Sequence, residues 1–161
     1  MIDLVRVDFR MIHGQVITQW VKKFSTQYII AVDDELAEDD FMQEVYKMAA
    51  PRGVKVKILS IAKAVEKRVA GDFDAKNTLV LFRTVAALSE AIKEGFDVKI
   101  IQIGGLGGGP GRKAVSNAIT LDQKDADELQ EIANKGIEVY FQTTPDYPKD
   151  TLADCIAKLN K

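Results

Sequence analysis

The only histidine in the 161-residue chain, His13, lies in a short segment that could carry covalent or acid–base chemistry. An imidazole can act as a nucleophile, a base or a ligand near neutral pH. Arg10 precedes it by three residues, and its planar guanidinium could bind two phosphate oxygens at once. Asp8 could accept the N–H of the other ring nitrogen, or it could form a structural ion pair with Arg6 or Arg10. We take His13 as the candidate reactive residue, against a surface or helix-capping histidine.

The residues that follow His13 suggest a place for an anion. If a helix begins near His13 and Gly14, the free N–H groups of its first turn point toward the loop, and the helix dipole favours negative charge there. Gly14 would let the backbone approach closely. We therefore expect the loop to hold a phosphoryl group, with Arg10 stabilising its charge and with Asp8, Gly14 and Gln15 among the binding residues.

Hydrophobic periodicity predicts an alternation of strands and helices around this loop. Runs rich in β-branched residues, several of them continuous enough for strands covered on both faces, occur at 2–9, 27–33, 54–60, 78–83, 98–103 and 137–142. Helical spacing links Val16, Trp20 and Phe24, then Phe41, Val45 and Met48, then Leu88 and Ile92, then Ala126, Leu129 and Ile132. The glycines that end three of the predicted helices in the left-handed conformation are Gly53, Gly95 and Gly136.

This alternation predicts a fold of the α/β class. We expect a single domain over residues 1–161, built on a mostly parallel open sheet of about six or seven strands with helices on both faces. Ligands of such sheets bind outside the carboxyl ends of the strands. The loop of His13 and the pair Arg83 and Thr84 both follow predicted strands, so we include Arg83 and Thr84 among the substrate-binding candidates, with a partner contact as their alternative.

Other motifs are better explained by structure than by chemistry. Asp33 and Asp34 could suggest a metal or a phospho-aspartate site, but we favour a structural or pocket-edge role. The glycine-rich run 104–111 has no nucleotide-binding register, so we interpret it as a rim of the pocket in preference to an anion site with Arg112 or Lys113. Cys155 lies on the apolar face of a predicted terminal helix, which indicates core packing.

Composition excludes several classes of protein. With 22 basic and 24 acidic residues, the formal net charge of −2 argues against a broad surface for nucleic acid or anionic membrane. One cysteine and one histidine cannot form a metal cluster, and we expect neither a metal nor a cofactor. The first residues lack the features of a signal peptide, and no run approaches about 18 apolar residues. We expect a cytoplasmic protein.

The segment from Arg6 to Val16, followed by Trp20, resembles the phosphorylation-site signature of the IIB components of the mannose/fructose/sorbose family in the bacterial sugar phosphotransferase system (PTS). Phe9 and Met11 stand where the commoner residues are Asp and Leu. The resemblance extends over almost the whole chain, including Val32 to Asp34 and Leu79 to Phe82.

The resemblance implies a phosphocarrier. Such a protein accepts a phosphoryl group on His13 from a phosphohistidine of a IIA partner, through Nδ1, without ATP or metal. It then passes the group to a sugar that enters through the membrane components IIC and IID, with which it associates peripherally. The family also makes a homodimer plausible. Mannose, fructose, sorbose and amino sugars are all candidate substrates.

Two other functions compete with the phosphocarrier. A histidine phosphatase or mutase also forms phosphohistidine near an arginine, but its mechanism needs a second histidine, which this chain lacks. A non-catalytic α/β regulatory module would carry an incidental histidine and no covalent phosphate.

Overall fold

The computed structural model, which describes residues 1–161, contains nine strands and seven helices. The strands are β1 (Ile2–Asp8), β2 (Tyr28–Val32), β3 (Lys55–Leu59), β4 (Thr78–Phe82), β5 (Ile100–Gly105), β6 (Lys113–Ser116), β7 (Ile119–Leu121), β8 (Glu138–Phe141) and β9 (Asp150–Thr151). The helices are α1 (Gly14–Phe24), α2 (Asp34–Ala37), α3 (Asp40–Ala49), α4 (Ile61–Ala70), α5 (Val85–Lys93), α6 (Gln123–Asn134) and α7 (Leu152–Leu159). No helix combines the length and the hydrophobicity that a membrane span requires.

Seven strands form one sheet in the order β3-β2-β4-β1-β5-β8-β9, in which only β9 pairs antiparallel to its neighbour. The predicted fold class is confirmed, and so are its six predicted strands. The sequence did not predict β9 or the antiparallel hairpin of β6 and β7. These strands have two to four residues, too few to show a period of two.

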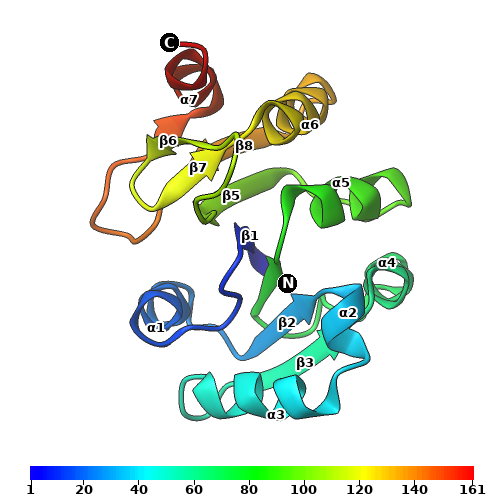
Figure 1. The fold of residues 1–161 in the computed structure, drawn as a ribbon. Helices are drawn as coiled ribbons and strands as arrows, with labels where there is room; N and C mark the ends of the chain where they lie inside the picture. The colour runs from blue at the N-terminus through cyan, green and yellow to red at the C-terminus, as the bar shows by residue number, and fades with distance from the viewer.

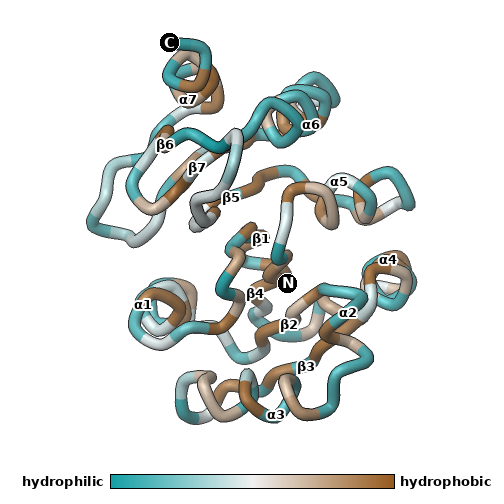
Figure 2. Tube along the Cα trace, in the orientation of Figure 1, coloured by the Kyte–Doolittle hydropathy of each residue, from teal (hydrophilic) through white to brown (hydrophobic).

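The helices cover both faces of the sheet, as Figure 1 shows. On one face, α1 and α3 pack over a core of 11 buried residues that includes Trp20. On the other face, α4, α5, α6 and α7 pack over a core of 26 buried residues. Hydrophobic residues run along the central strands β2 and β4 in Figure 2. The burial of these strands on both faces explains their continuous apolar sequences.

Helix α3 buries a different side from the one that the sequence predicts. The predicted apolar face is exposed, with 75% of Phe41, 40% of Val45 and 85% of Met48 accessible. Met42 and Tyr46 pack against the core in their place. The helix carries apolar residues on two sides, and the sequence alone could not decide which of them faces the edge strand β3.

The chain order places the carboxyl end of β1 at a topological switch point. The connection after β1 leads through α1 to β2 on one side of the sheet, whereas the connection after β5 leads toward β8 on the other side. Because β1 and β5 are neighbours, a crevice for ligands is expected between their carboxyl ends. Two of the three predicted helix-ending glycines are confirmed, since Gly95 and Gly136 directly follow the C-caps of α5 and α6 with φ angles of 113° and 89°. The prediction for Gly53 is wrong: α3 ends at an extended C-cap, Ala50, and Gly53, with a φ of 84°, lies in the turn that follows.

Candidate functional site

The loop after β1 is a tight turn that leads directly into α1. The backbone N–H of Met11 donates to the carbonyl oxygen of Asp8 over 3.0 Å. Met11 has a φ of 58°, a left-handed conformation that is uncommon outside glycine, and its side chain is fully buried. The core contact of Met11 therefore fixes the course of the loop. Gly14 also has a positive φ, of 41°, and a Cβ there would meet nothing within 4 Å, so the backbone angle favours glycine at this position.

His13 occupies the N-cap of α1 in an extended conformation. No side chain caps this helix, so its first N–H groups are open to an anion, as the sequence predicted. The imidazole is 22% exposed, while Gly14 and Gln15 beside it are exposed. The loop therefore presents the ring and the helix N-terminus on the same open surface.

A buried carboxylate holds one nitrogen of the ring. Nε2 of His13 lies 2.7 Å from Oδ2 of Asp8, which is 1% exposed. Burial by itself raises the pKa of Asp8, but the hydrogen bond from His13 and the positive charge of Arg6 lower it below its ordinary value. Because an ionised carboxylate only accepts hydrogen bonds, Nε2 must donate its proton to Asp8. The lone pair of the neutral ring is then on Nδ1.

The ion pair with Asp8 is made by Arg6, one of the two partners that the sequence left open. Nε and Nη2 of Arg6 donate to Oδ2 of Asp8 over 3.2 and 3.0 Å. Arg10 contributes only its backbone N–H, which donates to Oδ1 over 3.0 Å. The two arginines of the motif therefore have different surroundings, one buried under Asp8 and one at the surface.

The side chain of Arg10 is free for a ligand. It is exposed and forms no hydrogen bond or ion pair within the chain. Its Cζ lies 5.2 Å from the centre of the Phe9 ring, within the range of a cation–π contact. The guanidinium can therefore bind an incoming anion without first breaking an internal pair.

Two glycines close the site on the side of β5. A Cβ on Gly104 would lie 1.9 Å from Cζ of Arg6, and a Cβ on Gly105 would lie 3.0 Å from Oδ1 of Asp8. The glycine-rich loop was predicted to begin at Gly104, but Gly104 and Gly105 both belong to β5 and the loop begins after them. Their small size is needed because the side chains of β1 occupy the space beside them. Sequence reasoning missed this contact, although a glycine pair at the end of a strand is a signal of close approach.

Other predicted residues lie at strand ends but interact elsewhere. The carboxylate of Asp33 caps α2 and lies 3.8 Å from Nη1 of Arg83. Asp34 accepts the backbone N–H at the start of α4 over 2.7 Å. Both acidic residues are structural, as expected. The hydroxyl of Thr84 caps α5. No hydrogen bond or ion pair joins Arg83 or Thr84 to His13, and their contact with substrate stays a prediction.

The remaining candidates have partners within the chain or lie in the core. Arg112 pairs with Asp122 and Asp125 over 3.0 and 2.8 Å, so its guanidinium fastens the loop to α6. Nζ of Lys113 donates to the carbonyl oxygen of Lys161. Cys155 is fully buried, which confirms its place in the core, and burial raises the pKa of its thiol to about 12.

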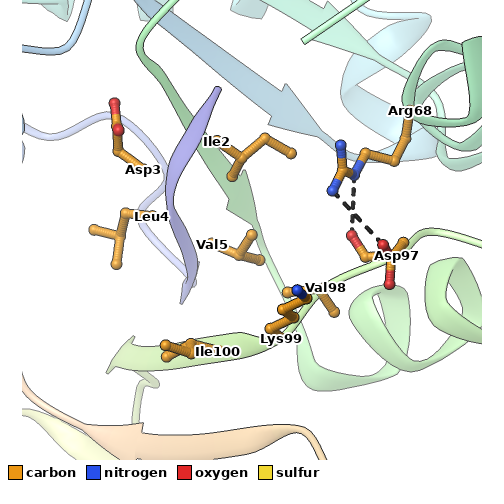
Figure 3. A pocket seen from close by; sticks show the side chains of 9 residues that line it. All are labelled: Ile2, Asp3, Leu4, Val5, Arg68, Asp97, Val98, Lys99 and Ile100. Atoms are coloured by element: carbon orange, nitrogen blue, oxygen red, sulfur yellow. Dashed lines mark hydrogen bonds and ion pairs between the residues drawn. The ribbon is translucent and has the colours of Figure 1, made fainter. Parts of the chain in front are cut away.

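A hollow at the opposite ends of the strands, near the amino ends of β1 and β5, contains none of the candidate residues. It is lined by residues 2–5, Arg68 and residues 97–100, where β1 and β5 begin. Figure 3 shows the guanidinium of Arg68 turned toward Asp97, whose carbonyl oxygen it binds over 3.0 Å. The candidate reactive groups lie instead beyond the carboxyl end of β1.

Known proteins are similar to this chain in sequence and in fold. The family described as PTS system sorbose subfamily IIB component matches residues 2–161. The sorbose-specific EIIB component of Lacticaseibacillus casei is 31% identical over 160 residues, which cover 99% of this chain and 96% of that protein. The mannose-specific EIIAB component of Escherichia coli (strain K12) is 29% identical over 160 residues, or 99% of this chain. The match covers 50% of that protein, so the chain spans about half its length.

The solved structures agree with the sequence matches. The crystal structure of manxB from Thermoanaerobacter tengcongensis has a TM-score of 0.90 and 34% identity, and the match covers 98% of this chain and 96% of that one. Together with the family match over residues 2–161, this likeness places the chain plainly: it belongs to the sorbose subfamily of IIB components of the sugar phosphotransferase system.

Proposed function

We propose that the chain is a phosphocarrier in which Nδ1 of His13 accepts a phosphoryl group and passes it on to a sugar. The contact that carries the proposal is the 2.7 Å pair between Nε2 of His13 and Asp8, which leaves the Nδ1 lone pair available for attack. The uncapped N-terminus of α1 and the free guanidinium of Arg10 support it, because both can stabilise the charged oxygens of a phosphoryl group.

In the first half-reaction, the donor is a phosphohistidine of a IIA domain. The Nδ1 lone pair attacks phosphorus in line, the new N–P bond forms, and the N–P bond to the donor breaks with its electron pair returning to the donor imidazole. The phosphorylated ring of His13 keeps its Nε2 proton and becomes positively charged. Asp8 balances that charge, and no net proton transfer or redox change is required.

In the second half-reaction, a sugar hydroxyl attacks the phosphorus and the N–P bond to His13 breaks. The electron pair returns to Nδ1, and the hydroxyl proton leaves to solvent. We propose that this step takes place at the cytoplasmic face of the membrane, with the chain docked on IIC and IID components. The names of the relatives, which specify mannose and sorbose, support a hexose as the substrate. A homodimer stays a prediction from the family resemblance.

The competing functions have less support in the geometry. A phosphatase or mutase mechanism uses a second histidine as its acid and base, and His13 is the only one in the chain. A regulatory module without chemistry has no need for an ionised carboxylate that fixes the tautomer of an accessible imidazole. The phosphocarrier uses each of these features.

Phosphorylation of the purified chain tests the proposal. The chain is incubated with phosphoenolpyruvate, the two general phosphotransferase proteins and a matching IIA domain, and phosphorus NMR is used to detect the product. We expect an acid-labile, alkali-stable phosphate in the wild-type chain and none in His13→Gln. Equal labelling of the His13→Gln variant would overturn the proposal, and wild-type protein without label would favour the regulatory module.

A further inference from the structure

We propose that Phe9 is a positioning residue for the phosphoryl transfer: its ring packs against Gly107 of the glycine-rich run and keeps the guanidinium of Arg10 over its face. The inference rests on the proposed phosphocarrier function, in which Arg10 stabilises the charge of the phosphoryl group. It concerns a residue of the motif that departs from the commoner sequence, and it gives the glycine-rich run a part in the site.

Hydrogen bonds fix the backbone of the loop at these two residues. The N–H of Phe9 donates to the carbonyl oxygen of Gly105 over 3.0 Å, so the pairing with β5 continues beyond the end of β1. The N–H of Arg10 donates to Oδ1 of Asp8, also over 3.0 Å. Both side chains therefore start from anchored backbone positions, and the place of the guanidinium depends on what supports the long side chain of Arg10.

The ring of Phe9 provides that support. Arg10 forms hydrogen bonds within the chain through its backbone only, and its Cζ lies over the Phe9 ring, 5.2 Å from the ring centre. A cation is attracted to an aromatic face at this distance, and the attraction does not use the N–H donors of the guanidinium. The ring therefore restrains the guanidinium and leaves its donors to the oxygens of a phosphoryl group.

The ring of Phe9 is placed in turn by Gly107. A Cβ on Gly107 would lie 3.0, 3.3 and 3.4 Å from three carbons of the ring, Cε2, Cζ and Cδ2. The φ angle of Gly107 is not positive, so the backbone conformation does not require glycine here. The close approach of the ring does, because a side chain at this position would take the space that the ring occupies.

Gly107 is itself held in place. Its carbonyl oxygen accepts hydrogen bonds from Oγ1 of Thr120 over 2.6 Å and from Nε of Arg112 over 3.2 Å. The ion pairs of Arg112 described above tie this part of the chain to α6. A series of contacts thus runs from α6 through the glycine-rich run to the ring of Phe9, and from the ring to Arg10.

Side-chain NMR tests the contact without any phosphate. In the wild type, we expect the ring current of Phe9 to shift the Cδ and Nε protons of Arg10 upfield, because the guanidinium lies over the ring. Phe9→Leu keeps an apolar side chain but has no aromatic face, and it should lose this shift, whereas Phe9→Tyr should keep it. Phe41→Leu is the matched control, since Phe41 is 75% exposed on α3 and makes no cation–π contact.

Transfer kinetics measure what the contact contributes to the reaction. A cation–π contact at an exposed site corresponds to a factor of about 2 to 5. At matched folded fraction and saturating IIA donor, Phe9→Leu should therefore accept phosphate about 2- to 5-fold more slowly than the wild type. Phe9→Tyr and the control Phe41→Leu should react at the wild-type rate.

A double-mutant cycle separates this role from a direct contact with the donor. In the Arg10→Ala background, Phe9→Leu should slow the transfer no further, because the ring acts only through the guanidinium. The same loss in both backgrounds would overturn the positioning role, and so would wild-type shifts of the Arg10 protons in Phe9→Leu.

Gly107→Ala tests the support beneath the ring. The added methyl group would displace the ring by a few tenths of an ångström, so the Arg10 proton shifts should change, whereas Gly108→Ala, whose Cβ meets nothing within 4 Å, should leave them as in the wild type. Unchanged shifts in Gly107→Ala would overturn the part of the glycine-rich run. Since these shifts need no phosphate, a wild-type chain that shows them but takes up no phosphate would overturn the phosphocarrier function alone.

Discussion

Replacing Gly104 with alanine adds one methyl group at the most crowded glycine of the chain. The new Cβ would lie 1.9 Å from Cζ of Arg6, whereas ordinary contact begins at about 3.4 Å. The guanidinium, whose Cζ lies 5.8 Å from the centre of the Trp20 ring, would have to retreat by about 1.5 Å. Its hydrogen bonds to Asp8 measure 3.0 and 3.2 Å, so such a movement breaks them or breaks the bonds to its other partners.

The expected cost follows from the burial of the pair. Disrupting a buried ion pair destabilises a protein by about 3–5 kcal/mol, out of a total of about 5–15 kcal/mol for a typical domain. With a denaturant slope of about 2 kcal/mol per molar urea, the unfolding midpoint of Gly104→Ala should fall by about 1.5–2.5 M. One added methyl group would thus remove at least about a fifth of the stability of a typical domain.

Urea unfolding followed by tryptophan fluorescence measures this loss. Trp20 is the only tryptophan and is 1% exposed, so its emission reports the core beside the site. Gly108→Ala is the matched control, because a Cβ there meets nothing within 4 Å, and it should change the free energy of unfolding by less than about 0.5 kcal/mol. Equal midpoints for the two variants would show that Arg6 can move freely, which would refute the reasoning.

Three further predictions concern charge and accessibility. Arg10→Ala should slow phosphoryl transfer about 100-fold without changing the urea midpoint, while the exposed Arg52→Ala should not slow it; equal rates would contradict a role for Arg10. Because the pKa of Asp8 is lowered in the folded chain, its stabilisation is present above about pH 4 and is lost as the pH falls through the lower folded value. Asp8→Asn should therefore lose stability at neutral pH yet lose less than the wild type between about pH 5 and pH 2, and a constant difference across that range would count against the lowered pKa. Cys155, with a pKa of about 12, should react with iodoacetamide roughly 1000-fold more slowly in the native chain than in urea, and rapid native labelling would contradict its burial.

The parts of the fold that the sequence predicts are those with local signals. Continuous apolar runs predicted the central strands, because burial on both faces leaves no room for alternation. The position of His13 at the start of α1 was also predictable from local signals, because a strand, a turn and an amphipathic helix follow one another within 24 residues. The exposure of Phe41, Val45 and Met48 on α3 was not predictable from local signals. It depends on how the helix is rotated against a strand elsewhere in the chain.

The site beneath His13 depends on contacts that are distant in the sequence. Arg6 meets Gln102 and Gln142 across separations of 96 and 136 residues, and no local pattern encodes such pairs. Arginines are also mostly exposed in proteins, so no local signal predicts that this one is buried. Spacing could identify Arg6 and Arg10 as alternative partners of Asp8, but only the packing of β5 against β1 separates their roles.

The left-handed conformation of Met11 has a consequence for the direction of the relay. A buried side chain fixes a backbone that is otherwise costly by about 1–3 kcal/mol, so the loop between Asp8 and His13 has one well-defined shape. Both half-reactions of the proposed relay would then use the same nitrogen in the same orientation. A catalyst changes rates and not equilibria, so this fixed loop sets how fast the phosphate would move, whereas the free energies of the phosphorylated donor and of the sugar phosphate set the direction.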